Sequence, residues 1–207
     1  MKKIHLISTS AHLIDNERKG EYIDSYKLIK SFEKDFESIT IIETISKVPL
    51  DYLENCGLKV CYSKLENPYS NKGVNWLNHI VSFLNDSNIE NDDIVVFITG
   101  RYKLINLNII SIINDYMLNN EIDFIAKDDR DLYPLTPHGV HTFLIAFTKN
   151  KFLDFYKWYE KNGTIEDCIE WDLKKYLESS DKSLILPKDE IMGVETRVSS
   201  GIKNKIC

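Results

Sequence analysis

Short apolar segments of strand length alternate along this chain with segments that have helical periodicity. The most strongly apolar of them is 92–99 (DDIVVFIT), and 72–85 (KGVNWLNHIVSFLN) carries its apolar residues on one helical face. This alternation is typical of an α/β domain in which a mostly parallel, Rossmann-type sheet is flanked by helices. It constrains the fold more than any other feature of the sequence.

The individual elements follow from the same periodicities. We expect strands at 2–8, 38–44, 58–63, 92–99, 123–127, 141–148 and 183–186. We expect helices at 21–36, 72–85, 106–118, 151–161 and 165–179. The polar stretch 10–20 and the tail from Gly193 are predicted to be loops.

The composition narrows the class of protein. With 207 residues, of which 43% are hydrophobic, the chain can form one domain with a full core. Its net charge of −6 argues against broad nucleic-acid binding, which needs a basic face. The spacing of Cys56, Cys61, Cys168 and Cys207 forms no C-x-x-C pair, which favours reduced thiols. Because the sequence shows neither a secretion signal nor an apolar membrane span, we expect a cytoplasmic protein, at most held at the inner membrane face.

The expected topology also predicts where a ligand binds. In open α/β sheets, ligands lie outside the carboxyl ends of the strands. That rule indicates the segments 8–20, 43–46, 62–72 and 99–103.

The most informative of these segments is Thr99-Gly100-Arg101-Tyr102, which ends the most apolar strand. Glycine permits either a close backbone approach or a positive φ. The planar guanidinium of Arg101 could grip a diphosphate with two hydrogen bonds at once. The alternative is a turn glycine followed by a surface arginine in an ion pair.

A second candidate is Asn71-Lys72-Gly73, directly before a predicted helix. The free N–H groups at a helix N-terminus favour an anion, and the charge of Lys72 adds to them. The alternative is an ordinary helix start after a polar loop.

Four short motifs occur in order along the first half of the chain. They are Arg18 with Tyr22 after the first strand, Glu43 at the end of the second, Asn71-Lys72-Gly73 before a helix, and Thr99-Gly100-Arg101-Tyr102 at the end of the fourth strand. Together they resemble a group of bacterial and viral glycosyltransferase-like proteins of the GT-A fold, which are nucleotide-diphospho-sugar transferases. The resemblance covers residues 1–110 well and continues more loosely through 141–143 and 193–195.

The resemblance implies a single GT-A-like domain, with a donor half at 1–110 and an acceptor half with the C-terminal tail at 111–207. It implies a glycosyltransferase that moves a hexosyl or related sugar from a nucleotide-diphosphate donor to a glycan or lipid-linked glycan, such as capsule or lipopolysaccharide. The donor-binding residues would be Ser8, Arg18, Glu43, Asn71, Lys72, Gly73, Thr99, Gly100, Arg101 and Tyr102.

The metal requirement stays open. Most GT-A enzymes hold a divalent metal with a D-x-D motif after the fourth strand, whereas this chain has Thr99-Gly100-Arg101 there. We expect Arg101, with Lys72, to neutralise the diphosphate in place of Mn²⁺ or Mg²⁺. The later D-x-D from Asp129 to Asp131, with Asp128 beside it, is a displaced metal site, a set of contacts to sugar hydroxyls, or a solvated loop.

An inverting transferase also needs a general base. The acidic cluster at 165–172, which includes Glu170, offers Glu166 and Asp167 as first candidates, with Asp129 behind them. The alternative is that these charges merely complement a helix dipole. His138 and His141 could bind a metal or a phosphate on the acceptor side, or be ordinary loop and strand residues.

Other functions remain as alternatives. A sugar nucleotidyltransferase shares the general fold but would need a glycine-rich, arginine-containing loop after the first strand, where 8–12 reads STSAH. A flavodoxin-like signalling domain would need an Asp where Ser8 or Ser63 stands. A non-catalytic nucleotide- or glycan-binding module is the alternative from a different class, and the absence of a D-x-D after the fourth strand favours it.

Overall fold

One seven-stranded sheet runs through the computed structural model, which describes residues 2–12, 16–119, 121–131, 139–166, 168–196 and 205–206. The strand order is β3-β2-β1-β4-β7-β6-β8, and every neighbouring pair is parallel except the two pairs that involve β7. This confirms the predicted α/β class with a mostly parallel sheet. The strands are β1 (Ile4–Ser10), β2 (Ser38–Glu43), β3 (Lys59–Tyr62), β4 (Ile94–Thr99), β6 (Phe124–Lys127), β7 (Leu144–Thr148) and β8 (Ser183–Leu186).

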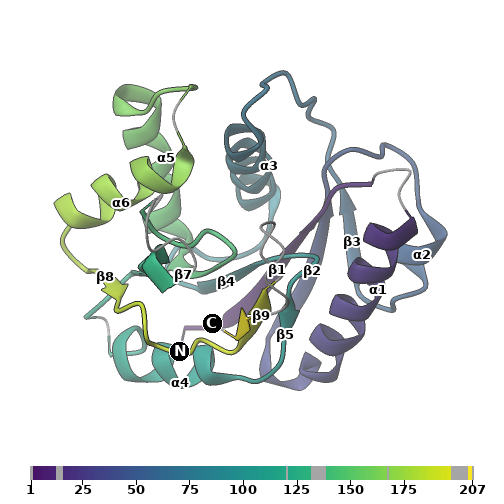
Figure 1. Ribbon diagram of the computed structural model, residues 1–207, viewed down its shortest axis with the longest axis horizontal. Helices are drawn as coiled ribbons and strands as arrows, with labels where there is room; N and C mark the ends of the chain where they lie inside the picture. The colour runs from purple at the N-terminus through teal and green to yellow at the C-terminus, as the bar shows by residue number, and fades with distance from the viewer. Residues whose placement is uncertain are drawn as a thin grey trace.

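Helices cover both faces of this sheet (Figure 1). On one face lie α1 (Asn16–Ser31), the short α2 (Asp51–Glu54) and α4 (Asn108–Tyr116). On the other lie α3 (Lys72–Asp86), α5 (Lys149–Asn162) and α6 (Ile169–Ser179). Two 3₁₀ turns, η1 (Glu33–Asp35) and η2 (Asp129–Asp131), complete the helical elements of the described ranges. None of these helices combines the length and apolar composition of a membrane span.

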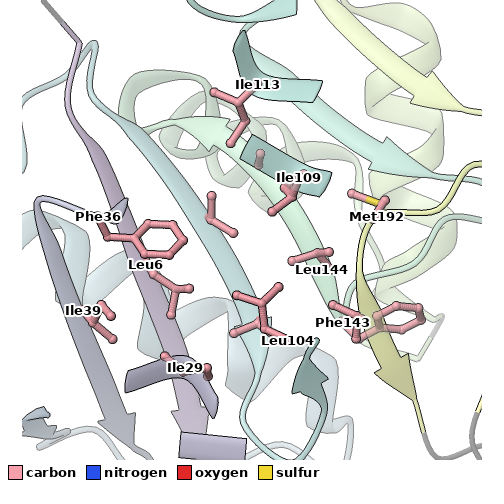
Figure 2. Close-up of a cluster of buried hydrophobic side chains, with 14 of the residues drawn as sticks. Leu6, Ile29, Phe36, Ile39, Leu104, Ile109, Ile113, Phe143, Leu144 and Met192 are labelled. Atoms are coloured by element: carbon pink, nitrogen blue, oxygen red, sulfur yellow. The ribbon is translucent and has the colours of Figure 1, made fainter. Parts of the chain in front are cut away.

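Two hydrophobic cores result because successive strand residues point to opposite faces. Leu6 of β1 packs toward α1 and α4, whereas its neighbour Ile7 packs toward α3 and α5. Figure 2 shows the first core, in which Leu6, Ile29 and Ile39 meet side chains of α4 and β7. In the second core, Phe147 stacks on Phe152 with ring centroids 4.3 Å apart.

A small second sheet corrects the prediction for the C-terminal tail. The order is β10-β9-β5, formed by β5 (Lys103–Leu104), β9 (Val194–Thr196) and β10 (Lys205–Ile206). The tail from Gly193 was predicted to be a loop, but the buried Val194 pairs with Leu104. The pairing is long-range and each strand is very short, so no local periodicity indicates it.

Two helix boundaries also differ from the prediction. The first helix begins at Asn16 rather than residue 21, so Arg18 lies in its first turn instead of a loop. The sixth begins at Ile169 rather than residue 165, so Glu166 precedes the helix. Both errors concern polar segments, in which capping geometry rather than hydrophobic spacing decides where the helix starts.

Candidate functional site

The carboxyl ends of β1, β2 and β4 meet at one edge of the sheet, next to the point where the strand order reverses. From β1 the chain moves outward to β2 and β3, while β4 pairs with the other side of β1. Such a switch point opens a crevice beyond the strand ends, where α/β proteins bind their ligands. Ser10 ends β1, Glu43 ends β2 and Thr99 ends β4.

Glu43 is a fully buried carboxylate at this edge. Its Oε1 accepts hydrogen bonds from the backbone N–H groups of His12, Ile45 and Ser46, at 3.0, 2.8 and 2.9 Å. Its Oε2 is buried and has no hydrogen-bond partner in the described part of the chain. The backbone therefore holds one oxygen in place, while the other retains its capacity to accept a hydrogen bond.

Two further polar atoms share this environment. The hydroxyls of Ser8 and Ser10 are also buried without a hydrogen-bond partner among the described residues. Both act on the Tyr26 hydroxyl, whose pKa burial raises well above its usual value while the two serines act in the opposite direction. Leaving a buried polar group unsatisfied costs about 1–3 kcal/mol, so three such atoms together mark a candidate ligand site rather than ordinary core.

Gly100 shows why a glycine follows β4. Its N–H donates to the carbonyl of Thr9 at 3.1 Å, and a Cβ at this position would collide with that carbonyl and with the Tyr26 hydroxyl. Of the two reasons considered for this glycine, close approach is the one that the structure shows.

Arg101 follows directly and is half-exposed, with its guanidinium carbon 5.6 Å from the ring centroid of Tyr102. Among the described residues, no carboxylate lies within ion-pair distance of it, so the alternative of a surface ion pair is not formed there. Burial raises the pKa of Tyr22, and the charges of Arg101, Glu43 and Arg18 all act on it. All three charged side chains are therefore close enough to influence the Tyr22 hydroxyl.

At the Asn71-Lys72-Gly73 motif, a side chain rather than a free anion site occupies the first N–H groups of α3. The Asn71 side chain caps the helix by accepting from the N–H groups of Gly73 and Val74, at 2.9 and 3.4 Å. Gly73 packs so closely on Ile169 that a Cβ would collide with it. Asn71 thus caps α3 and Gly73 packs it against α6, while Lys72 is exposed and its contact with a diphosphate remains a prediction.

Glu170 lies on the opposite side of the β4 end. The Thr99 N–H donates to the carbonyl of Phe143 at 2.9 Å, and the neighbouring Thr142 hydroxyl donates to Glu170 Oε1 at 2.9 Å. The other carboxylate oxygen accepts from the Cys168 thiol at 2.6 Å. Burial, and then Glu170 itself, raises the pKa of Cys168 to about 12.

The acidic segment after β6 approaches the same side. Asp128 is buried and paired with Arg130 at 2.8 Å; burial opposes its ionisation, but the Arg130 hydrogen bonds outweigh that and lower its pKa. Asp129 is buried, its N–H donates to Gly139 at 3.4 Å, and its charge acts on Cys168. Gly139 in turn packs against the backbone of Glu170.

The remaining predicted residues divide into two groups. His141 is buried and its ring lies 4.2 Å from that of Phe143, whereas Glu166 is exposed. Asp167, His138 and the side chain of Asp131 lie outside the described residues.

The described residues do not fit a divalent metal at this edge. Within those ranges, no group of three or more His, Cys, Asp or Glu side chains is arranged to hold a metal ion. The β4 end offers Thr99, Gly100 and Arg101, and a guanidinium cannot ligate a cation. Asp128 is already engaged by Arg130.

Sequence reasoning named Glu170 within its acidic cluster but preferred Glu166 and Asp167. The late start of α6 makes the difference, since Glu170 falls in the first turn of the helix and faces Thr142. It also overlooked Ser10, although that residue ends the first strand just as Glu43 ends the second.

No family model and no curated protein sequence matches the chain. Solved structures do: 4-diphosphocytidyl-2C-methyl-D-erythritol synthase of Anaerococcus prevotii has a TM-score of 0.57 at 13% identity, covering 97% of this chain and 94% of that one. Glucosyl-3-phosphoglycerate synthase of Mycobacterium tuberculosis has a TM-score of 0.54 at 9% identity. The match covers 97% of this chain and 74% of that one. A putative nucleotide-diphospho-sugar transferase of Desulfovibrio desulfuricans has a TM-score of 0.51 at 11% identity. The match covers 90% of this chain and 80% of that one.

At these identities the likeness establishes the fold. The chain has the α/β fold of nucleotide-diphospho-sugar transferases, in agreement with its mostly parallel seven-stranded sheet. This chain covers 65% of the length of another similar structure, a mycobacterial protein.

Proposed function

We propose that this protein is a glycosyltransferase that uses a nucleotide-diphosphate sugar bound at the carboxyl edge of β1, β2 and β4. The observation that carries the proposal is the buried Glu43, which has one oxygen fixed by three backbone N–H groups and the other without a partner among the described residues. The hydroxyls of Ser8 and Ser10, which have no hydrogen-bond partner in the part of the chain that the structure describes, accompany it. The half-exposed Arg101, which follows the neighbouring strand β4, adds a positive charge to the proposed site.

Each donor residue has a chemical task in this proposal. Glu43 accepts a hydrogen bond from an N–H or hydroxyl of the nucleoside, and Arg101 binds the diphosphate with its planar donor fork. Gly100 lets the backbone of the β4 end come close to β1, which sets the position of Arg101. Arg18 and Lys72 add positive charge on either side.

The acceptor side supplies the base. Glu170 is held by Thr142 and Cys168 beside the β4 end, and we place it ahead of Asp129, Glu166 and Asp167 as the group that takes the acceptor proton. The acceptor oxygen forms a bond to the anomeric carbon as the bond from that carbon to the diphosphate breaks. The nucleoside diphosphate leaves with its charge stabilised by Arg101, which does the electrostatic work of a metal.

The acceptor would be a cell-surface glycan such as capsule or lipopolysaccharide, made at the inner face of the membrane by a cytoplasmic enzyme. The segments 128–131 and 138–141 would then face the acceptor sugar. One solved structure with this fold, 12% identical, is a mannosyltransferase of Pyrobaculum calidifontis in complex with GDP-mannose and Mn²⁺; this chain covers 55% of it. That complex supports sugar transfer on this fold, while the Thr99-Gly100-Arg101 sequence here favours a metal-free variant.

A donor-turnover assay tests the proposal. Purified protein is incubated with UDP-, GDP-, CMP-, ADP- and dTDP-sugars, with and without EDTA, and nucleotide release is measured. We expect one donor to be hydrolysed slowly in EDTA and Arg101→Ala to abolish that release. Release that requires Mn²⁺, or that survives in Arg101→Ala, would contradict the assigned role of Arg101.

A second candidate is a non-catalytic nucleotide- or glycan-binding module, favoured because the carboxylates of Asp128 and Glu170 already accept hydrogen bonds from neighbouring residues. Such a module would bind one nucleotide and release nothing from any donor. A third outcome, pyrophosphate release from a nucleoside triphosphate and a sugar phosphate, would indicate the nucleotidyltransferase alternative.

A further inference from the structure

A relay of hydrogen bonds runs from helix α3 to the segment that follows Glu43. It starts at His79 of α3, which is buried. The ring nitrogens of His79 are bonded to the Ser63 hydroxyl at 2.7 Å and to the Asn67 amide oxygen at 3.0 Å. The amide nitrogen of Asn67 donates in turn to the Thr44 carbonyl at 2.8 Å. The relay therefore connects the helix to the backbone directly after β2.

The direction of each hydrogen bond in this relay follows from its chemistry. Because the Asn67 amide nitrogen donates to Thr44, the amide oxygen is left to accept from His79, so Nε2 of the ring carries the proton. Nδ1 then accepts from the Ser63 hydroxyl. Burial, followed by the charge of Lys47, lowers the pKa of His79 and keeps the ring in the neutral form that this arrangement needs near pH 7.

The segment at the end of the relay is the one that fixes Glu43. Two of the three N–H groups that bond Glu43 Oε1 belong to Ile45 and Ser46, the residues next to Thr44. Thr44 also donates to the Ser10 carbonyl through its N–H and through its hydroxyl, each at 2.9 Å. The relay thus ends on the residue that joins Glu43 to two of its own hydrogen-bond donors.

A second branch of the relay reaches the backbone of Glu43 itself. The Ser63 N–H donates to the Glu43 carbonyl at 2.9 Å, while the Ser63 hydroxyl donates to His79. The segments 44–50 and 63–71 lie outside the helices and strands, whereas His79 belongs to a helix of 15 residues. Side-chain bonds from a packed helix restrict the motion of such segments, which have few ladder hydrogen bonds of their own.

We propose that His79 and Asn67 are positioning residues for Glu43. They hold the segment 44–46 in place, so that its backbone N–H groups keep Glu43 Oε1 fixed and leave Oε2 in the orientation that receives the nucleotide. They act through the backbone and not by contact with the reacting atoms. The consequence for nucleotide binding rests on the proposed function, whereas the effect on the segment 44–46 does not.

The first part of the test is amide hydrogen exchange, followed by NMR in isotope-labelled, nucleotide-free protein. Asn67→Asp keeps the size of the side chain but places an oxygen against the Thr44 carbonyl. We expect the exchange of the Ile45 and Ser46 amides to accelerate at least about tenfold. The matched control is Asn119→Asp, which makes the same charge change in the exposed turn after α4, on the opposite face of the sheet from α3.

A pair of variants at His79 separates hydrogen bonding from packing. His79→Leu keeps an apolar side chain against the core but removes both hydrogen bonds. His79→Gln places an N–H donor where Nε2 lies and so keeps the bond to Asn67. We expect His79→Leu to accelerate exchange of the Ile45 and Ser46 amides, and His79→Gln to restore it to within about twofold of the wild-type rate. A role in packing alone predicts no such rescue.

The second part is calorimetry with UDP, GDP, CDP, ADP and dTDP. For the nucleotide that binds, we expect Asn67→Asp and His79→Leu to raise the Kd about three- to tenfold. Because Glu170 is not part of the relay, kcat for donor release should stay close to the wild-type value.

Three results would overturn the proposal: unchanged amide exchange in Asn67→Asp and His79→Leu, equal exchange in His79→Leu and His79→Gln, or accelerated exchange with an unchanged Kd. Failure of the proposed function looks different. In that case the amides of Ile45 and Ser46 still exchange faster in the variants, but no nucleotide binds the wild-type protein or Glu43→Gln leaves its Kd unchanged.

Discussion

Glu43 and Glu170, on the two sides of the β4 end, differ in how their carboxylate oxygens are bonded. On the β1–β2 side, Glu43 Oε2 and the hydroxyls of Ser8 and Ser10 are buried without hydrogen-bond partners in the described structure. On the α6 side, both oxygens of Glu170 are engaged by Thr142 and Cys168. The contrast suggests that the first side is prepared to receive a ligand, while the second holds a carboxylate in a defined position.

The largest effect that can test this contrast is on turnover. Glu170→Gln removes the proposed base but keeps the side chain's shape and its ability to accept the hydrogen bond from Thr142. We therefore expect kcat to fall about 10²–10⁴-fold with little change in donor KM. Steady-state kinetics with the donor found in the turnover assay measures both constants.

Glu166→Gln is the matched control for that variant, since Glu166 is exposed and precedes the helix. It should retain activity within a factor of about two. If instead Glu166→Gln loses activity and Glu170→Gln keeps it, the assignment of the base to Glu170 is wrong.

The next effect is on nucleotide affinity. Glu43→Gln can still accept the three backbone hydrogen bonds through its carbonyl oxygen, but it places an NH₂ donor where Oε2 accepts. We expect the Kd for the nucleotide to rise at least about tenfold, the effect of losing one hydrogen bond to a charged group. Calorimetry measures it, with the exposed Glu66→Gln as control; equal Kd values would remove Glu43 from the donor site.

A third effect concerns the backbone that brings the two sides together. Gly100→Ala introduces a Cβ that collides with the Thr9 carbonyl and the Tyr26 hydroxyl. We expect a loss of about 1–3 kcal/mol in the free energy of unfolding, measured by urea denaturation. Gly20→Ala in α1 meets no atom within 4 Å and should be neutral or stabilising, so equal behaviour of the two variants would refute the close approach.

The smallest effect is on the pH dependence of stability. The folded pKa of Cys168 is raised from 9.0 to about 12, so above pH 9 the unfolded chain loses a proton that the folded chain keeps. The stability contributed by the neutral thiol is thus full below pH 9 and is lost as the pH rises toward 12. Cys168→Ala should show a smaller fall in Tm between pH 8 and pH 10 than the wild-type protein; an identical fall would contradict the raised pKa of the Cys168 thiol.

Sequence patterns predicted the sheet and the residues at its carboxyl edge well because both follow from local spacing. The strand 92–99 and the polar residues that end the strands, such as Glu43, are visible in a few neighbouring residues. The absence of a hydrogen-bond partner for Glu43 Oε2 among the described residues was not predictable, since it depends on the loop that bonds Oε1.

The surroundings of Glu170 and the tail were harder to predict because they depend on distant partners. Glu170 gains its position from Thr142, 28 residues earlier, and β9 from β5, about 90 residues earlier. The Asn71-Lys72-Gly73 motif shows the same limit: its helix start is visible locally, but the packing of Gly73 on Ile169 is not.

The most direct test of the central claim is calorimetric binding of UDP, GDP, CDP, ADP and dTDP in the presence of EDTA. The account predicts that one of these nucleotides binds without metal and that Arg101→Ala abolishes the binding, because the guanidinium takes the place of a divalent ion on the diphosphate. Binding that appears only with Mn²⁺ or Mg²⁺, or no binding of any nucleotide, would contradict it.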